Sequence, residues 1–238
     1  MTLGWHILIV FWRWIQGYPV AFFHPKRPKT MTSATASYNV AFEPAHPLAK
    51  HRLPTGTVTL LFSDIEGSTR LLQRLGTAEY ARVLGVQRRL LRIAFQNWNG
   101  KEVDTAGDGC FTVFQDASAA VSAAVAAQCA LALYPWPEGT EVRVRMGVHT
   151  GQPGLFAEGY VGLDVHVAAR ICTAAKGGQI LLSRTTRELI EPTLPAGMRL
   201  LRKGPHRLKG LDQPEHLSEV RTARLACRST GREIRMAA

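Results

Sequence analysis

The chain has 238 residues, of which 46% are hydrophobic, so it can form one ordinary domain with extensions and is too apolar for wholesale disorder. Its formal net charge of +11 comes from the two ends of the chain, because residues 57–198 carry thirteen basic and thirteen acidic side chains. Residues 1–56 carry six basic side chains and one acidic side chain, and residues 199–238 carry ten basic and four acidic side chains. No zinc-finger, homeodomain or RNA-binding aromatic pattern accompanies these ends, so we do not expect nucleic-acid binding. The cysteines form no C-x-x-C pair, which argues against a disulfide scaffold or zinc site and favours a reducing, cytoplasmic compartment (Cys110, Cys129, Cys172 and Cys227).

A hydrophobic, aromatic-rich segment at residues 5–23 is just long enough to span a bilayer. Arg13 lies near its middle, where an arginine costs about 2.5–3.5 kcal/mol on insertion scales. Two alternatives stay open: residues 1–30 are a mis-annotated or disordered leader upstream of a start at Met31, or residues 5–23 contact the membrane while the body stays in the cytoplasm. Residues 31–56, which contain three prolines, are expected to form an extended linker.

The first predicted element of the domain is a strand. The apolar, β-branched run at residues 58–62 is typical of a strand buried on both faces. Asp64 follows it, and an acidic residue at the carboxyl end of a buried strand lies where open α/β sheets bind ligands. Helical periodicity then covers residues 68–98, with interruptions expected around Gly76 and Gly85.

Strands and helices alternate through the rest of the domain. A β-hairpin is predicted for residues 101–115 with its turn at Gly107-Asp108-Gly109, and Asp116 is the expected N-cap of an alanine-rich helix. The alternation of residues 141–148 predicts a half-buried strand. Further expected elements are a glycine-rich loop at 150–162, a helix at 164–175 and a strand at 179–182. Ser183 is the expected cap of a short helix that runs to Ile190, and strands are expected at 198–201 and 215–220. This order indicates an α+β fold, an α/β sandwich around a mostly antiparallel sheet.

Four motifs in this order resemble the catalytic domain of class III adenylyl and guanylyl cyclases, which has a ferredoxin-like α+β fold. They are FSDIEGST at residues 62–69, the Gly107-Asp108 turn, RMGVHTG at residues 145–151 and AAR at residues 168–170. The resemblance covers residues 57–220 and leaves residues 221–238 as a basic tail. It is closest to bacterial cyclase-homology domains fused to an ATPase and a helix-turn-helix regulator. We expect this domain to stand alone, because no G-x-x-x-x-G-K-[ST] loop occurs.

The resemblance implies an activity and a metal requirement. Such domains convert a purine nucleoside triphosphate, ATP or GTP, into a 3′,5′-cyclic nucleotide and pyrophosphate for intracellular signalling, with two Mg²⁺ or Mn²⁺ ions per site. Asp64 and Asp108 match the family's metal-binding aspartates, and the Ile65 carbonyl is a further ligand. Read without the resemblance, Asp64 is a charge partner for a helix N-terminus and Asp108 is a turn former.

Three basic residues match positions that bind phosphate in the family. Arg145 corresponds to a triphosphate-binding arginine, and Lys209 to a lysine that reaches the terminal phosphate. Arg170 corresponds to the arginine that stabilises charge on the α-phosphate in the transition state. Read without the resemblance, Arg145 is an exposed strand residue, Lys209 is a solvated charge of the tail, and Arg170 is an arginine on a helix surface. His149 is expected to serve packing or a local hydrogen bond, with no catalytic role.

Three positions depart from the adenylyl cyclase pattern. Asp104 stands where adenylyl cyclases place a lysine that donates to adenine, and a carboxylate only accepts. It is suited instead to the N–H and NH₂ edge of guanine, although it is one methylene shorter than the glutamate of guanylyl cyclases. His166 replaces the asparagine that orients the ribose, and Gly159, near the second base-reading position, has no side chain. Because positioning supplies much of catalysis, these changes predict weak or unusual cyclase activity, or none.

In the family, the site forms between two domains, with the metals on one and the residues matching Asp104, His166 and Arg170 on the other. A single chain must therefore pair with itself, which predicts a homodimer with two equivalent sites. The leading interpretation is a metal-dependent purine nucleotide cyclase that is poorly selective or leans towards GTP. The alternative is an inactive cyclase-homology module that binds nucleotide or dimerises as a regulator. A third is a signalling subunit tethered to the membrane through residues 5–23.

Overall fold

The computed structural model describes residues 53–157 and 159–223. The strands are β1 (Val58–Ile65), β2 (Lys101–Ala106), β3 (Gly109–Phe114), β4 (Val144–Gly151), β5 (Gly154–Phe156), β6 (Gly159–Val161), β7 (Ile180–Leu182), β8 (Met198–His206) and β9 (Glu215–Thr222). The helices are α2 (Ser68–Gln96), α3 (Ala117–Leu133), α4 (Leu163–Ala174) and α5 (Arg184–Ile190), followed by a 3-10 turn at Glu191–Thr193. The predicted leader, almost all of the predicted linker and most of the predicted tail lie outside the described residues.

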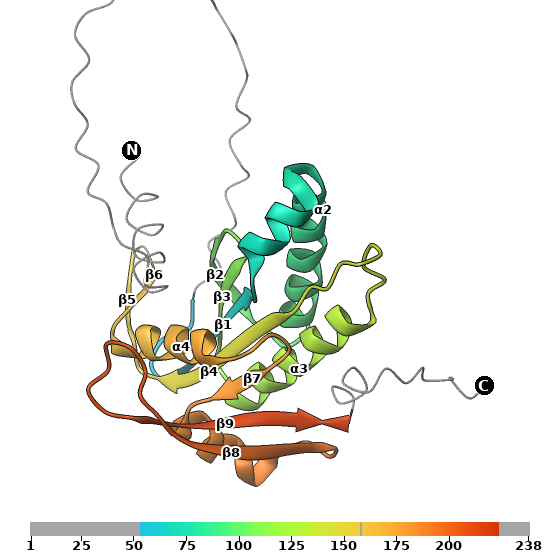
Figure 1. The fold of residues 1–238 in the computed structure, drawn as a ribbon. Coiled ribbons are helices and arrows are strands. Elements are labelled where there is room, and N and C mark those ends of the chain that lie inside the picture. The colour runs from blue at the N-terminus through green and yellow to red at the C-terminus, as the bar shows by residue number, and fades with distance from the viewer. Residues whose placement is uncertain (1–52, 158, 224–238) are drawn as a thin grey trace, which may run out of the picture. The chain divides into compact units, whose positions relative to one another are not determined.

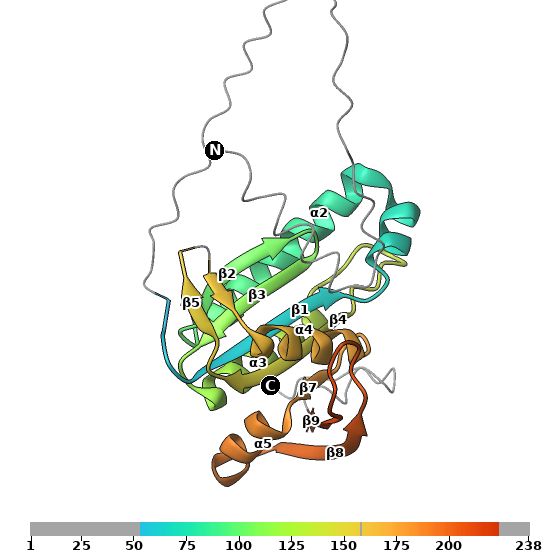
Figure 2. The same ribbon diagram turned by 90° about the vertical axis from the view of Figure 1, so that its left-hand side faces the viewer.

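A seven-stranded sheet in the order β2-β3-β1-β4-β7-β9-β8 organises the described chain (Figure 1). Its neighbours pair antiparallel, except for the parallel pair β4–β7. The predicted α+β fold with a mostly antiparallel sheet is therefore confirmed. Strands β5 and β6 form a separate two-stranded hairpin. In Figure 2, this hairpin stands beside β2 and β3.

Strand β1 is an inner strand of the sheet, and every one of its residues is buried. It pairs with β3 on one side and with β4 on the other. Leu61 and Ile65 belong to the main hydrophobic core, whereas Phe62 stacks on Phe111 of β3 with ring centroids 4.3 Å apart. The alternation of a strand directs these two sets to opposite faces of the sheet. The prediction of a first strand buried on both faces is confirmed.

Helices cover both faces of the sheet. Buried residues of α2, α3 and α5 join the main core with the inner side chains of β1 and β4. Helix α4 packs on the opposite face, where Val167 and Ile171 meet Leu181 of β7, Leu217 of β9 and Leu208 of the β8–β9 loop. The two views show α4 on one side of the sheet and α3 on the other (Figures 1 and 2). In residues 53–157 and 159–223, no helix has both the length and the apolar character needed to cross a membrane.

Helix α2 is kinked at only one of its two predicted interruptions. Gly76 has φ 73° and ψ 167°, a left-handed conformation that suits glycine and breaks the helical turn. The predicted interruption at Gly85 is wrong, because the helix runs through it without a break. The buried side chains of Val83 and Leu91 flank Gly85 and hold this part of α2 in the core. Packing therefore overrides the low helix propensity of that glycine.

Two expectations for residues 141–162 are corrected. Strand β4 begins at Val144 rather than at Glu141, and its later residues are buried on both faces because α4 covers the second face. A half-buried strand is therefore the wrong description of its carboxyl half. The predicted loop at residues 150–162 contains the β5–β6 hairpin, whose strands of three residues are too short to show alternation.

The side-chain caps predicted for α3 and α5 are present, whereas α2 begins after Gly67 and has no side-chain cap. The Asp116 carboxylate accepts a hydrogen bond from the Ala119 N–H at 2.6 Å at the start of α3, and Ser183 accepts one from the Thr186 N–H at 3.2 Å at the start of α5. Each satisfies an N–H that has no partner within its helix. The last two strands are also present, with β8 running on past Leu201 to His206.

Candidate active site

The chain fold brings Asp64 and Asp108 together. Asp64 is the second-last residue of β1, and Asp108 lies in the turn between β2 and β3. Because β1 and β3 are adjacent and antiparallel, the carboxyl end of β1 meets the amino end of β3. The Ile65 N–H donates to Asp108 Oδ2 at 3.0 Å, which fixes the Asp108 side chain beside the end of β1. The three predicted metal-site residues thus form one cluster.

The Asp64 carboxyl is in an unfavourable place for a negative charge. Burial, and then the nearby Asp108 carboxylate, raise the pKa of Asp64 to about 7. Two close carboxylates of which one is buried suit a divalent cation, which removes both the desolvation cost and the mutual repulsion. In residues 53–157 and 159–223 no group of three or more His, Cys, Asp or Glu side chains is arranged so that it could hold a metal ion. A bound ion would therefore need backbone, water or phosphate oxygens as further ligands.

Arg145 lies directly across from Asp64 in the β1–β4 pair. Its Nε and Nη2 donate to Asp64 Oδ2 at 3.0 and 2.5 Å, and its Nη1 donates to the Thr173 carbonyl of α4 at 3.3 Å. The predicted phosphate-binding arginine therefore contacts the predicted metal-binding carboxylate, a partnership that the sequence pattern did not reveal. The Asp64 charge in turn raises the pKa of Arg145 against the opposing effect of burial.

His166 and Arg170 lie one turn apart on α4. The Arg170 residue is 8% exposed, so a surface helix arginine is the wrong description of this side chain. Burial lowers the pKa of Arg170, and burial together with the Arg170 charge lowers the pKa of His166. Helix α4 therefore places an imidazole, whose neutral form is favoured, next to a largely buried cation.

Lys209 is exposed in the loop between β8 and β9. Its neighbour Leu208 is buried against Val167 and Ile171 of α4, which anchors the loop beside that helix. The structure therefore places Lys209 near the helix that carries His166 and Arg170.

Asp104 is half-buried on β2. Its Oδ1 accepts a hydrogen bond from the Thr105 N–H at 2.8 Å, and burial raises its pKa. Gly159 lies close by: a Cβ built on it would be 3.5 Å from Cγ1 of Val103. The predicted base-reading positions thus gather where β2 faces the β5–β6 hairpin.

The local hydrogen bond expected for His149 is present. Its Nε2 lies 3.0 Å from Asp164 Oδ1, and Asp164 Oδ2 accepts from the Gln152 N–H at 2.8 Å. The pair joins β4 to the first turn of α4, so His149 makes a local structural hydrogen bond.

The family model for the adenylate and guanylate cyclase catalytic domain matches residues 51–220, which is most of the chain. The chain belongs to this family. A relative in Mycobacterium tuberculosis, an uncharacterized protein, is 36% identical over 167 residues, which cover 70% of this chain and 56% of the relative. The chain thus spans about half the length of that relative. An adenylate cyclase of Mycosarcoma maydis is 35% identical over 156 residues, covering 55% of this chain and 6% of that protein.

Among solved structures, the cyclase domain is similar to the adenylyl cyclase CyaB from P. aeruginosa. The TM-score is 0.62 at 25% identity, with 70% of this chain and 94% of that chain covered. The agreement of sequence family and fold supports the class III assignment made from the four motifs. Catalytic domains of this family generally use divalent metal ions, in keeping with the paired carboxylates at the end of β1.

Two residues of α2 near Asp64 and Asp108 were missed by sequence reasoning. Burial, and next the Asp108 charge, raise the pKa of the Tyr80 phenol to about 12, so the ring lies beside the carboxylate cluster. The Arg88 guanidinium donates from Nη2 to the Gly107 carbonyl and so contacts the turn that carries Asp108. Their spacing of eight residues gives a weak signal, because it fits many exposed helix faces equally well.

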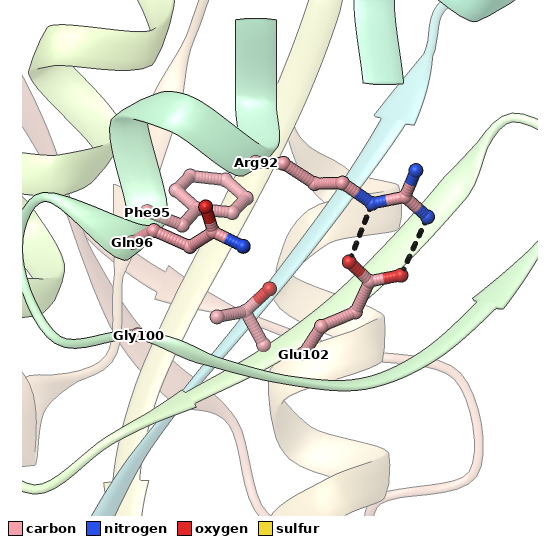
Figure 3. A pocket seen from close by; sticks show the side chains of 6 residues that line it. Arg92, Phe95, Gln96, Gly100 and Glu102 are labelled. Atoms are coloured by element: carbon pink, nitrogen blue, oxygen red, sulfur yellow. Dashed lines mark hydrogen bonds and ion pairs between the residues drawn. The ribbon is translucent and has the colours of Figure 1, made fainter. Parts of the chain in front are cut away.

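A small hollow lies away from these residues, at the other end of the β2–β3 hairpin (Figure 3). It is lined by Arg92, Phe95, Gln96, Gly100, Glu102 and Thr112. Its lining includes an ion pair between Arg92 of α2 and Glu102 of β2. The hollow is at the start of β2, whereas Asp108 follows its end, so it does not coincide with the candidate active site.

Proposed function

We propose that this chain is a homodimeric, metal-dependent nucleotide cyclase that acts on a purine nucleoside triphosphate with weak activity and a leaning towards GTP. The observation that carries the proposal is the contact between the end of β1 and Asp108, which sets two carboxylates side by side, one of them buried. We propose that the protein is cytoplasmic and that any contact with a membrane is confined to residues 5–23.

The proposed reaction joins the nucleotide 3′-oxygen to the α-phosphorus while the bond from that phosphorus to the leaving pyrophosphate breaks, and the hydroxyl proton is released. Asp64, Asp108 and the Ile65 carbonyl would hold Mg²⁺ or Mn²⁺. Bound ions acidify the 3′-hydroxyl and neutralise the leaving phosphates. The carboxylates provide the required negative charge at a partly dehydrated position, where the attraction between a carboxylate and a metal ion is stronger than in water.

The basic residues have separate proposed roles. Arg145 would exchange its contact with Asp64 for one with the triphosphate, and Lys209 would reach the terminal phosphate from its loop beside α4. Arg170 would donate to the α-phosphate as charge develops, and its burial strengthens that interaction. His166 would orient the ribose with one hydrogen bond, because burial and Arg170 keep its ring neutral.

A homodimer is supported by an apolar surface next to the candidate site. Phe156 and Val161 of the β5–β6 hairpin and Leu163 at the start of α4 are 65%, 59% and 67% exposed. Large apolar side chains grouped in this way are typical of an interface. We propose that a second copy covers them, so that Asp104, His166 and Arg170 of one chain complete the metal half of the other.

The proposed activity is tested with purified chain, Mn²⁺, and ATP or GTP, with the cyclic product identified by mass spectrometry. Asp64→Ala and Asp108→Ala are expected to reduce product to background while circular dichroism stays unchanged. Product that persists in either variant would reject the assigned metal site.

Sharing of the site is tested by mixing two inactive variants, Asp64→Ala and Arg170→Ala. Random exchange makes half of the dimers mixed, and each mixed dimer has one intact site, so activity should return to about a quarter of wild type. A mixture as inactive as its components would show that each chain builds its own site.

The alternative is a non-catalytic module that binds nucleotide and regulates a partner. It is favoured by the base-reading region, where Gly159 offers no side chain and Asp104 cannot donate. Absence of product from wild type in the same assay, together with retained nucleotide binding by equilibrium dialysis, would select this alternative.

A further inference from the structure

Strand β2 carries a β-bulge immediately before Asp104. Glu102 pairs with Thr112 of β3, but Asp104 pairs with Phe111, so Val103 is an extra residue on β2. An extra residue reverses the face to which every later side chain of the strand points. On a regular strand Asp104 would share the face of Glu102, because side chains two residues apart point the same way.

The bulge turns Asp104 to the face of the sheet that carries the candidate active site. Directly opposed residues of an antiparallel pair project from the same face, so Asp104 lies on the face of Phe111. Phe111 stacks on Phe62, and Asp64 follows Phe62 by two residues on β1. Asp104 of one protomer and its own Asp64 therefore face the same side of the sheet.

Glu102, by contrast, faces α2 and is held there by three hydrogen bonds. Its Oε2 accepts from Arg92 Nε at 2.7 Å, and its Oε1 accepts from Arg92 Nη2 at 2.8 Å and from Thr105 Oγ1 at 2.6 Å. Figure 3 shows the two parallel contacts between the guanidinium and the carboxylate. A bidentate, charge-assisted pair of this kind fixes direction as well as distance.

The Thr105 contact depends on the bulge. Residues three apart on a regular strand point to opposite faces, so Thr105 could not meet Glu102. Because Val103 is the extra residue, Glu102 before the bulge and Thr105 after it both face α2. Val103 lies towards the β5–β6 hairpin, near Gly159. The hydrogen bond from Thr105 is therefore compatible only with the bulged form of β2, whereas the two bonds from Arg92 hold Glu102 on the α2 side.

We infer that Arg92, Glu102 and Thr105 form a positioning clamp that holds the β2 bulge, aims Asp104 at the base and thereby sets the choice between guanine and adenine. This inference rests on the proposed function, because it takes Asp104 as the base-reading residue. The clamp residues touch neither substrate nor metal in this scheme. They act through the direction of one carboxylate, and their distinctive effect is on selectivity.

The experiment compares kcat/KM for GTP and for ATP in wild type and in Glu102→Leu, which removes the acceptor of all three hydrogen bonds. Loss of one well-directed contact to the base should lower the GTP-to-ATP ratio about tenfold, which corresponds to about 1.4 kcal/mol. In an Asp104→Ala background, Glu102→Leu should leave the ratio unchanged, since no side-chain acceptor remains to be aimed at the base. Thr105→Val removes a single hydrogen-bond donor, so it should lower the GTP-to-ATP ratio by a smaller factor. This variant tests the clamp even if Glu102→Leu does not fold.

The matched control is Glu79→Gln, which removes the exposed Arg82–Glu79 ion pair of 2.8 Å from the same helix and should not alter the ratio. An equal fall in kcat/KM for both nucleotides, or the same shift in the Asp104→Ala background, would overturn the clamp without contradicting the proposed cyclase activity. A GTP-to-ATP ratio that Asp104→Ala leaves at the wild-type value would overturn base reading by Asp104 and the clamp with it. Wild type that neither converts nor binds either nucleotide would overturn the proposed function itself.

Discussion

Arg145 donates two hydrogen bonds to a single oxygen of Asp64, from Nε at 3.0 Å and from Nη2 at 2.5 Å. The Arg145 and Asp64 side chains are 19% and 8% exposed, so the pair is largely removed from water. The arginine offsets part of the cost of a buried carboxylate that also faces Asp108. Stability and the proposed chemistry therefore meet in one ion pair, because the same two residues are the proposed ligands of phosphate and metal.

Removal of the arginine should destabilise the fold more at high pH than at low pH. Arg145 lowers the pKa of Asp64, so without it the folded carboxyl holds its proton still more strongly. In Arg145→Met we expect a loss of about 1.5–3 kcal/mol at pH 8, where Asp64 is mostly ionised, and a smaller loss at pH 5. Urea denaturation of both proteins in a chelator measures this difference. Equal losses at the two pH values would show that the pair contributes only packing.

The ionisation of Asp64 should itself make stability depend on pH. Its pKa is raised on folding, from 3.8 to about 7, so the folded state binds the proton more tightly. The contribution of Asp64 to the free energy of unfolding is then fully favourable below pH 3.8 and falls as the pH rises from there through 7. Asp64→Asn should remove this dependence and gain stability relative to wild type between pH 5 and 8.

Urea midpoints across this pH range give the measurement, in the presence of a chelator. The exposed Glu141, which pairs loosely with Arg143 at 3.7 Å, provides the control: Glu141→Gln should follow the wild-type profile. If Asp64→Asn also follows the wild-type profile, the Asp64 pKa in the folded chain is close to its ordinary value.

The sequence supports prediction of the fold where local signals and packing agree. The β1 strand, the Asp116 and Ser183 caps and the turn around Asp108 each follow from short-range patterns that the tertiary structure preserves. Gly85 was mispredicted because burial of the helix around it outweighs its propensity. The burial of the second face of β4 was missed because α4, which covers it, comes later in the chain.

The candidate site was predictable as a set of residues but not as a set of contacts. Asp64, Asp108 and Arg145 are found by the family motifs, whereas the ion pair between Asp64 and Arg145 depends on the register of β1 against β4. The bulge at Val103 leaves no mark in the periodicity of a six-residue strand, so the direction of Asp104 could be learned only from the β2–β3 pairing.

Substitution of Asp104 by a donor should move the nucleotide preference towards ATP. A lysine at this position can donate to adenine N1, whereas the guanine N–H and NH₂ groups would lose their acceptor. In Asp104→Lys we expect the GTP-to-ATP ratio of kcat/KM to fall by about tenfold or more. His166→Asn is the control, because a ribose contact should raise kcat for both nucleotides equally. A ratio that is unchanged in Asp104→Lys would refute base reading at this position.

Gly147 should be the most sensitive glycine of the sheet to substitution, because α4 packs directly on it. A Cβ at this position would lie 2.1 Å from the backbone nitrogen of Cys172 and 2.6 Å from its Cα, and backbone atoms cannot swing aside as a side chain can. Gly147→Ala should therefore push α4 away from β4 and lower the free energy of unfolding by about 1–3 kcal/mol. Since His166 and Arg170 are on α4, the proposed activity should fall with it.

Gly85→Ala is the matched control for that substitution. Gly85 is within α2, and a Cβ there would meet nothing within 4 Å. The same added methyl group should therefore raise stability by about 0.5–1 kcal/mol through helix propensity and leave activity unchanged. Thermal and urea unfolding measure the stability of both variants relative to wild type. If Gly147→Ala were as stable as wild type, the close approach of α4 to β4 would have to be relaxed in solution, and α4 could not hold Arg170 at a fixed distance from the sheet.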